Sequence, residues 1–316
     1  MARETVEVVL VGLGSIGLKH YNNLVQLGAR VVAVADPEYS RLPSEVPERY
    51  DDPMEAIAEE ADGRAVVIAS PTEFHVEQVQ AAAAAKAAYV LVEKPPSVTG
   101  TEWRLTRGKL GDTRCVVGFN WRFHRGIDET LVQRCKGSKA VYTIVSNDNI
   151  TTWPNYGPNS FARDARSGGV LLTSLTHSID LAILTFGPPT ALVSALQSDD
   201  PSITNADHMA MVRILHASTG ASGLLYTAWR PPPATFITII RETDCMCVGV
   251  SDLQYSADRA QMHSRMMDSF LNYARTGREG NLCTAEQAQV VMDVVDAARL
   301  SWANRGPVQF GEMPEA

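Results

Sequence analysis

The sequence predicts an α/β protein with an N-terminal doubly wound parallel sheet and a C-terminal α/β domain that has an open-faced, mainly antiparallel sheet. Three observations lead to this fold class. A chain of 316 residues is long for a single hydrophobic core. Uniformly apolar, strand-length runs alternate with helical patterns over residues 1–119, as in a parallel sheet covered on both faces. Longer, alternating segments follow, so a second domain is predicted over residues 120–316.

The first domain begins with a strand, a glycine-rich turn and a helix. Val6–Val11 is a continuous apolar run, and the hexapeptide Gly12–Gly17 follows it directly. The next helix carries His20 on its apolar face and ends at Gly28, a suitable C-cap. Further elements are expected as strands at Val31–Ala35, Ala65–Ala69, Tyr89–Val92 and Val116–Gly118, and as an alanine-rich helix at Glu73–Lys86.

The second domain is expected to contain a sheet with one solvated or partner-covered face. Its strands are predicted at Lys139–Asn147, Thr190–Gln197, His208–His216, Ser222–Trp229 and Phe236–Arg241. Two helices finish the chain, Asp258–Thr276 and Thr284–Asn304. The last one opens with Thr284-x-x-Gln287, the pattern of a capping box.

The composition is that of an ordinary globular protein, with 45% hydrophobic and 20% charged residues. A net charge of −8 argues against binding to nucleic acid or to an anionic membrane. No run is long and apolar enough for a membrane span, and the N-terminus lacks the core of a signal peptide, so a cytoplasmic location is expected. The five scattered cysteines are expected to be reduced structural thiols, and no metal site is expected.

The glycine-rich turn is an informative signal because of its context. G-x-G-x-x-G between a strand and a helix is the fingerprint of a dinucleotide site. Gly12 permits the tight turn, Gly14 lets the backbone approach a pyrophosphate, and Gly17 allows close packing of helix and strand. Backbone amides at the helix start, around Ser15 and Ile16, are expected to bind the phosphates. The first domain is therefore predicted to be an NAD(P)-binding Rossmann domain.

Asp36 ends the second strand about 20 residues after the fingerprint, where a carboxylate hydrogen-bonds the ribose hydroxyls of NAD. A 2′-phosphate would be repelled there, so NAD is the expected cofactor. NADP stays an alternative because Arg41 lies close in sequence. The other interpretation of Asp36 is a residue that caps the turn before Pro37.

Glu93-Lys94-Pro95 directly follows the fourth strand. Ligands of open α/β folds bind at the carboxyl ends of the strands. Lys94 is thus a candidate for proton transfer to or from a hydroxyl or carbonyl group, if its pKa is lowered. The alternative is a surface lysine after a strand.

Four motifs together resemble a known family: Gly12–Gly17, Ser70-Pro71-Thr72-x-x-His75, Glu93-Lys94-Pro95, and Gly168-Gly169 followed by His177-x-x-Asp180. Nearly the whole chain is similar to the Gfo/Idh/MocA family, the glucose–fructose oxidoreductase and inositol dehydrogenase group. The resemblance implies hydride transfer between NAD(P) and a carbon of a sugar, cyclitol or sugar derivative. It also implies a second domain for substrate binding and oligomer contacts, and so a homodimer or homotetramer.

The resemblance also assigns site residues. Lys94 matches the catalytic lysine, and His177 matches the histidine at the substrate carbon. Besides the fingerprint and Asp36, the expected cofactor-binding residues are Ser70, Pro71, Thr72, His75, Glu93, Lys94 and Pro95. The expected substrate-binding residues are Asn120, Arg122, Tyr156, Arg163, Thr173 and His177.

One position departs from the family pattern. Thr173 stands one helical turn before His177, where the dehydrogenases carry an aspartate. A threonine can hydrogen-bond a substrate hydroxyl but cannot take its proton, so Lys94 and His177 are the proton-transfer candidates. Reduction of a ketone is then favoured as much as oxidation of an alcohol. His177 lies in the apolar pattern Val170–Phe186, so a satisfied core histidine is its alternative interpretation.

Arginines and aromatic residues of the second domain are further candidates for substrate contacts. If they converge, the arginines can bind a phosphate or carboxylate; the alternative is ordinary surface arginines. They are Arg122, Arg125, Arg163, Arg166 and Arg230. Trp153, Tyr156 and Trp229 are candidates for stacking on a sugar ring, with interior packing as the alternative. The Gly-Gly-Val-Leu-Leu-Thr sequence is similar to a subgroup linked to unusual and nucleotide-linked sugars.

Two other functions stay open. One is reduction of a non-sugar conjugated substrate, as in biliverdin reductase, and the other is a non-catalytic regulator that binds a dinucleotide. Thr173 suits either function, whereas Lys94 and His177 argue against the non-sugar reductase and Glu93-Lys94-Pro95 argues against the regulator.

Overall fold

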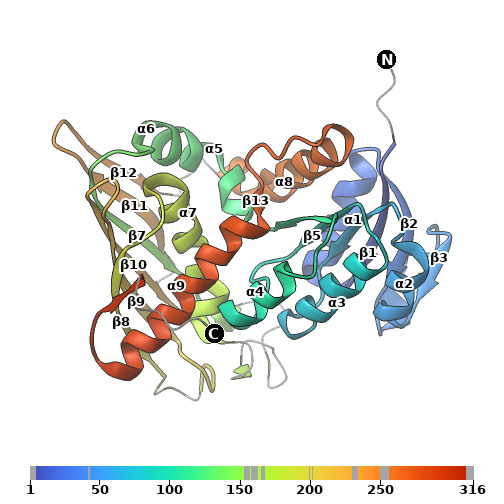
Figure 1. The fold of residues 1–316 in the computed structure, drawn as a ribbon, viewed down its shortest axis with the longest axis horizontal. Coiled ribbons are helices and arrows are strands. Elements are labelled where there is room, and N and C mark those ends of the chain that lie inside the picture. Colours follow the sequence, from blue (N-terminus) through green and yellow to red (C-terminus); the bar gives the residue numbers. More distant parts are fainter. Residues whose placement is uncertain are drawn as a thin grey trace. The chain divides into compact units, whose positions relative to one another are not determined.

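The computed structural model describes residues 5–41, 43–152, 157, 163–164, 168–198, 200, 202–229, 234–249 and 256–310 (Figure 1). The chain forms two compact units. The first unit consists of Met1–Ser97, Glu102–Phe123 and Gln261–Ala288. The second consists of Val98–Thr101, His124–Ala260 and Gln289–Ala316. The single predicted division at residues 119 and 120 differs from this arrangement, because the chain returns to the first unit near its end.

The first unit is built on a sheet with the strand order β13-β6-β5-β4-β1-β2-β3. Neighbouring strands are parallel except β13, which pairs antiparallel with β6. The strands are β1 (Glu7–Val11), β2 (Arg30–Ala35), β3 (Glu48–Tyr50), β4 (Ala65–Ile68), β5 (Tyr89–Val92), β6 (Arg114–Val117) and β13 (Cys283–Thr284). The central strand β4 is buried at every residue, as its uniformly apolar sequence predicts.

Helices of the first unit cover this sheet (Figure 1). They are α1 (Ser15–Gln26), α2 (Pro53–Glu60), α3 (Thr72–Ala84), most of α4 (Gly100–Arg107) and most of α8 (Ser256–Thr276). Met266, Phe270 and Leu271 of α8 are buried in one cluster with Leu10 and Val67 of the sheet. Burial of this apolar helix face explains why a segment so late in the chain belongs to the first unit.

The second unit is built on a sheet with the order β12-β11-β7-β10-β9-β8-β14. Its pairs are antiparallel except β7 with β10, which are parallel. The strands are β7 (Val141–Asn147), β8 (Ala191–Gln197), β9 (Met209–His216), β10 (Ala221–Ala228), β11 (Ala234–Ile240), β12 (Cys245–Gly249) and β14 (Val308–Gln309). The helical segments are α5 (Arg125–Ile127), α6 (Gln133–Cys135), α7 (Thr176–Phe186), most of α9 (Ala285–Asn304) and the π-helical turns Asp128–Val132 and Leu171–Leu175.

The two faces of the second sheet differ in exposure. On one face the register aligns Ile240, Val141, Ser222 and Leu215 across four strands. This outer face carries the exposed apolar side chains Val141, Val193, Met211, Leu215, Phe236 and Ile240. On the opposite face Ile144, Val212 and Ile214 are fully buried, and Tyr142 stacks on Phe186 of α7 at 4.4 Å. The predicted α/β class with an open-faced, mainly antiparallel second sheet is confirmed.

Short elements are the ones that the sequence analysis did not predict. β3, α2, α4, β12, β13 and β14 are all of eight residues or fewer. α2 has recognisable start signals, because Asp52 accepts a hydrogen bond from the Met54 amide at 2.8 Å and Pro53 occupies the first turn. β3 is polar and forms because it pairs with β2.

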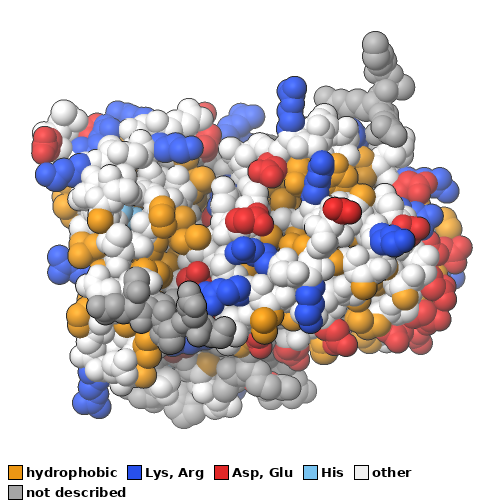
Figure 2. All heavy atoms as spheres, in the orientation of Figure 1, with side chains coloured by type: hydrophobic (Ala, Val, Ile, Leu, Met, Phe, Trp, Pro, Cys, Tyr) orange, Lys and Arg blue, Asp and Glu red, His pale blue; other side chains and the backbone are white. Residues whose placement is uncertain are grey.

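Acidic side chains gather over α2 and β3 on the surface of the first unit (Figure 2), among them the exposed Glu48, Asp51, Glu55 and Glu59.

All five cysteines are free, and Cys245 and Cys247 are exposed on β12. Within the described part of the chain, no helix is long and apolar enough to cross a membrane, and no cluster of three or more metal-binding side chains occurs.

Candidate active site

The glycine-rich turn joins β1 to α1, and its three glycines have different surroundings. Gly12 has a φ of +85°, and a Cβ there would lie 2.6 Å from the Ser70 nitrogen. A Cβ on Gly17 would lie 1.8 Å from the carbonyl oxygen of Gly12, so a side chain would force α1 away from the turn. Nothing lies within 4 Å of the Cβ position of Gly14, the N-cap of α1. A phosphate therefore has room to approach the helix start, which begins with Ser15 and Ile16.

Asp36, directly after β2, is turned toward the protein and is only 5% exposed. Its Oδ2 accepts a hydrogen bond from the Leu13 amide at 2.6 Å, and its Oδ1 accepts one from the Glu38 amide at 2.9 Å. The Arg41 guanidinium lies 3.4 Å from Oδ1. The carboxylate thus holds the fingerprint turn and also caps the turn after β2. Oδ1 accepts from both the Glu38 amide and Arg41, whereas Oδ2 accepts one hydrogen bond and has a further lone pair for a ribose hydroxyl.

Lys94 lies at the carboxyl edge of the first sheet, two residues after β5. Its side chain is partly buried, and the Lys94–Pro95 peptide bond is cis. Burial lowers the pKa of the Lys94 ammonium group, and the charge of Glu93 opposes that effect. A lysine with a lowered pKa can exchange a proton with a substrate hydroxyl or carbonyl group closer to neutral pH.

The Ser70-Pro71-Thr72 segment follows β4 and starts α3, with Pro71 as the N-cap. Ser70 donates its hydroxyl to Gln78 Oε1. His75 is buried, and its two ring nitrogens each lie 2.8 Å from a carbonyl oxygen, one of Ser70 and one of Pro95. His75, whose binding to the cofactor stays a prediction, lies between the loop after β4 and the loop after β5 and contacts both. Burial lowers the pKa of its imidazole.

Two predicted substrate-binding residues of the first unit, Asn120 and Arg122, are buried and form hydrogen bonds within that unit. The Asn120 amide donates to Nε2 of His263, on α8, at 3.0 Å. Arg122 is 3% exposed and donates to the Leu282 carbonyl oxygen and to Gln287 Oε1, at 3.2 and 2.8 Å. These contacts fasten the segment after β6 to the C-terminal part of the first unit.

His20 and His263 are site residues that the sequence analysis did not assign. His20 lies on α1 and is fully buried, with its Nε2 2.7 Å from Glu93 Oε1. The sequence contained one indication of this role for His20. A histidine on the apolar face of the fingerprint helix needs a polar partner inside the protein. The sequence contained no indication of which partner that would be.

In the second unit, the helix that follows Gly168-Gly169 carries two predicted site residues. His177, on α7, is 9% exposed, and Thr173 is buried in the preceding π-helical turn. The Thr173 hydroxyl donates to the Gly169 carbonyl oxygen at 2.7 Å. A Cβ on Gly169 would lie 2.4 Å from Asp207 Oδ1, and Asp207 Oδ2 accepts from the Leu171 amide. Gly169 therefore makes room for the carboxylate of Asp207, which holds this helix start.

The remaining candidates of the second unit are distributed as follows. Trp229 is fully buried and donates its indole N–H to Ser174 Oγ, which supports interior packing. Arg125 is exposed, and Arg163 is partly buried. Tyr156, Trp153, Arg166 and Arg230 lie outside the described residues. Convergence of the arginines therefore stays a prediction.

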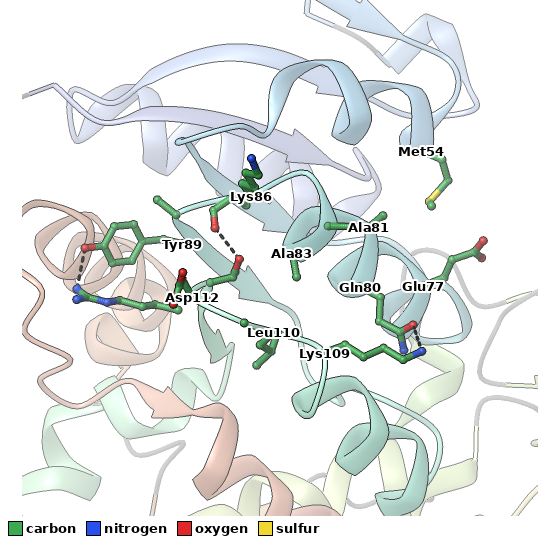
Figure 3. A pocket seen from close by; sticks show the side chains of 16 residues that line it. Met54, Glu77, Gln80, Ala81, Ala83, Lys86, Tyr89, Lys109, Leu110 and Asp112 are labelled. Atoms are coloured by element: carbon green, nitrogen blue, oxygen red, sulfur yellow. Dashed lines mark hydrogen bonds between the residues drawn. The ribbon is translucent and has the colours of Figure 1, made fainter.

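A shallow hollow of about 870 Å³ lies elsewhere in the first unit (Figure 3). Its lining includes Tyr89 and Arg114, the first residues of β5 and β6, together with the C-terminal end of α3. Lys109 donates to Gln80 Oε1 there, and Arg114 donates to the Tyr89 hydroxyl. Because parallel strands share one direction, this hollow is at the amino edge of the sheet, opposite the edge that carries Lys94.

Comparison with known proteins identifies the family. Residues 6–109 match the sequence profile of the Gfo/Idh/MocA oxidoreductases with their NAD-binding Rossmann fold, and residues 104–243 match the profile of the family's C-terminal domain. The chain therefore belongs to the Gfo/Idh/MocA oxidoreductase family. The predicted resemblance and the prediction of an enzyme, a nicotinamide-dependent dehydrogenase or reductase acting on CH–OH or C=O groups, are confirmed.

The individual relatives share less than a third of their residues with this chain. The inositol 2-dehydrogenase of Rhizobium meliloti (strain 1021) is 28% identical over 242 residues, which cover 72% of this chain and 69% of that protein. The structure of myo-inositol 2-dehydrogenase from Lactobacillus plantarum is 18% identical, with a TM-score of 0.82 over 97% of this chain and 99% of that one. The WlbA dehydrogenase from Chromobacterium violaceum, solved with NADH and UDP-GlcNAcA, is 16% identical, with a TM-score of 0.81 over 100% of this chain and 98% of that one. The two structures show the shared fold.

Proposed function

We propose that this protein is an NAD-dependent dehydrogenase or reductase that interconverts a hydroxyl and a ketone on a sugar, cyclitol or sugar derivative. The observation that carries the proposal is the place of Lys94, directly beyond β5 at the carboxyl edge of the Rossmann sheet. The fingerprint turn lies at the carboxyl end of β1, and so at the same edge of the sheet as Lys94. When bound, NAD supplies the hydride acceptor for oxidation, and its reduced form supplies the hydride for reduction.

The preference for NAD is supported by the surroundings of Asp36. Arg41 lies between two carboxylates, 3.4 Å from Asp36 and 2.7 Å from Glu38. Two negative charges around one cation leave a net negative potential, which opposes a 2′-phosphate. The open space at Gly14 fits the pyrophosphate of NAD, and the further lone pair of Asp36 Oδ2 fits its ribose.

Lys94 and His177 are the proposed catalytic residues. The lowered pKa of Lys94 supports its role as the group that exchanges a proton with the substrate oxygen. His177 is proposed to orient and polarise the reacting carbon's oxygen. The hydroxyl of Thr173 is hydrogen-bonded to its own helix, so Thr173 is not proposed to transfer a proton.

The substrate class is supported by the relatives. One relative is an inositol 2-dehydrogenase, and one structural neighbour was solved with a nucleotide-linked sugar acid. A cyclitol is the first choice of substrate because the inositol dehydrogenase match covers more than two thirds of both chains.

A turnover screen tests this proposal. It follows reduced nicotinamide with NAD(H) and NADP(H) separately, against inositols and free, phosphorylated, carboxylated and nucleotide-linked sugars. Lys94→Ala is the test variant, and Lys109→Ala, an exposed lysine of the first unit, is the matched control. Turnover that is lost in the first variant and kept in the second supports the proposal. NAD binding without turnover across the panel would overturn it and favour a dinucleotide-binding regulator.

We also propose that the outer face of the second sheet forms homo-oligomer contacts, as a homodimer or homotetramer. The exposed Val141, Met211, Leu215 and Ile240 support this assignment, because a contiguous apolar face is costly in water. Sedimentation should show a smaller assembly for Met211→Glu. Leu105→Glu, which changes an exposed leucine of α4, is the control and should leave the assembly intact.

A further inference from the structure

A buried histidine–glutamate pair lies beside Lys94 and has no assigned role in the proposed hydride transfer. His20 of α1 donates from Nε2 to Glu93 Oε1 at 2.7 Å. The other oxygen, Glu93 Oε2, accepts a hydrogen bond from the backbone amide of Lys94 at 3.2 Å. One carboxylate thus links the fingerprint helix to the residue that we propose as the proton-transfer group.

The protein makes room for this carboxylate and removes it from water. A Cβ on Gly118 would lie 3.1 Å from Glu93 Oε1, so glycine is what leaves the space. Glu93 is 7% exposed, and a buried carboxylate stays ionised only where partners replace its hydration. Burial by itself raises the pKa of Glu93, but His20, above all through its hydrogen bond, and the neighbouring Lys94 hold that pKa below its ordinary value. Among these partners, His20 makes the largest contribution to keeping Glu93 ionised.

The other groups around the pair contribute less charge. The ring of His263 lies 6.1 Å from that of His20 and accepts a hydrogen bond from Asn120. Burial lowers the pKa of His263 to about 4, so it is uncharged at neutral pH. Among the described residues of the first unit, the further titratable groups that act on this cluster are Lys19 of α1 and His75 of α3.

Two opposing influences therefore act on Lys94 from its own unit. Burial favours loss of its proton, and the Glu93 carboxylate favours retention. The balance depends on whether Glu93 is ionised, and that depends on the donor at position 20.

We propose that His20 and Glu93 are positioning residues for Lys94: His20 keeps the Glu93 carboxylate ionised, and that charge keeps the proton on Lys94. The catalytic consequence rests on the proposed function. Lys94 must hold a proton to donate it during ketone reduction, and must be without it to accept one during alcohol oxidation. The His20–Glu93 pair then sets the pH range in which each direction is fastest.

The test measures the protonation of Lys94 directly, by NMR of protein carrying lysine isotopically labelled at Cε. The chain has six lysines, and Lys94→Arg assigns the Lys94 signal. In Glu93→Gln the titration midpoint of Lys94 should fall by about one pH unit, a tenfold lower ratio of ammonium to amine. His20→Leu should shift it in the same direction, because a buried carboxylate without its donor takes up a proton. The double variant should shift no further than Glu93→Gln.

Two further variants separate this role from a structural one. His20→Gln keeps a neutral N–H donor and should restore most of the ordinary midpoint. His216→Gln is the control: His216 is an equally buried histidine of the second unit, 2.7 Å from the Tyr142 hydroxyl, and its loss should leave the Lys94 titration unchanged. If His20→Leu does not fold, Gly118→Ala replaces it, since the added methyl crowds Glu93 Oε1, weakens its hydrogen bond with His20 and should also lower the midpoint.

An unchanged Lys94 midpoint in Glu93→Gln would overturn the proposal, as would a shift in His20→Leu of the opposite sign. With an active substrate, the pH profiles of oxidation and reduction should both move to lower pH by the amount seen in the NMR titration. A shifted midpoint in a protein that turns over none of the substrates would retain this inference and reject the proposed function.

Discussion

The two sheets of this protein place their polar side chains in different ways. In the first sheet the apolar strands are covered on both faces, so Asp36 and Lys94 lie beyond the carboxyl ends of β2 and β5. In the second sheet alternate residues of a strand face outward, so Met211 and Arg213 are exposed in the middle of β9. A doubly covered sheet confines chemistry to its edge, whereas an open sheet offers a whole face for contact.

The largest expected effect is at the edge of the first sheet. Lys94→Ala should reduce kcat/KM about 10³-fold, because a positioned proton-transfer group contributes in that range. Affinity for NADH, measured by fluorescence titration, should change less than about twofold, which a loss of proton transfer alone predicts. A tenfold or smaller loss of kcat/KM would show that the edge does not carry the chemistry.

The two faces of the second sheet can be compared within one strand. Ile214→Ala, on the covered face of β9, should lower the free energy of unfolding by about 3 kcal/mol, because it leaves a cavity in the core. Met211→Ala, on the outer face, should lower that of the isolated chain by less than about 0.5 kcal/mol. Urea denaturation at low protein concentration measures both. Equal losses would contradict the difference between the faces.

His263, whose ring lies near that of His20 in the first unit, should make the stability of the protein depend on pH. Burial lowers the pKa of His263 from 6.5 to about 4, so between these values the folded state binds fewer protons than the unfolded state. The free energy of unfolding should therefore fall as the pH decreases through this window, by about 3 kcal/mol more in the natural protein than in His263→Gln. The glutamine can still accept the hydrogen bond from Asn120. Urea denaturation at both ends of the window checks the difference, and identical losses would exclude the effect.

The smallest expected effect separates binding from folding in the fingerprint. Gly14→Ala places a methyl group in open space, so the unfolding temperature should change little. The same methyl occupies the approach of the pyrophosphate, so the Kd for NADH should rise about tenfold, or about 1.4 kcal/mol. Calorimetry measures this value. Unchanged affinity would mean that the dinucleotide does not approach Gly14.

The local patterns of the sequence were sufficient for most of the fold. The strand, glycine turn and helix at the start are found within one or two residues of their predicted positions. The alternation of β9 and β10 also predicted an open second sheet. These features depend on the spacing of apolar residues along a segment and on the backbone conformations available to glycine. Both can be recognised within a short stretch of sequence.

Candidate site residues could be predicted where a motif contains them, and could not be predicted where their partners come from distant parts of the chain. Lys94 and the fingerprint glycines follow from strand ends and spacing. His20, Glu93 and His263 come from three separated segments, and only their packing shows that one carboxylate joins the first to Lys94. Likewise, the role of His75 as a link between two backbone loops depends on carbonyl groups that have no sequence signature.

The sequence by itself determined the order of the longer strands and helices, the dinucleotide fingerprint and the placement of Lys94 at a strand end. Only the tertiary structure decided that α8 and β13 return to the first unit, and that a histidine of the fingerprint helix holds the carboxylate beside Lys94. The physical reason is the distance along the chain over which each interaction acts. Periodicity and turn chemistry act between neighbours in the chain, whereas the burial of an apolar helix face and the pairing of a buried charge are settled between residues that only folding brings together.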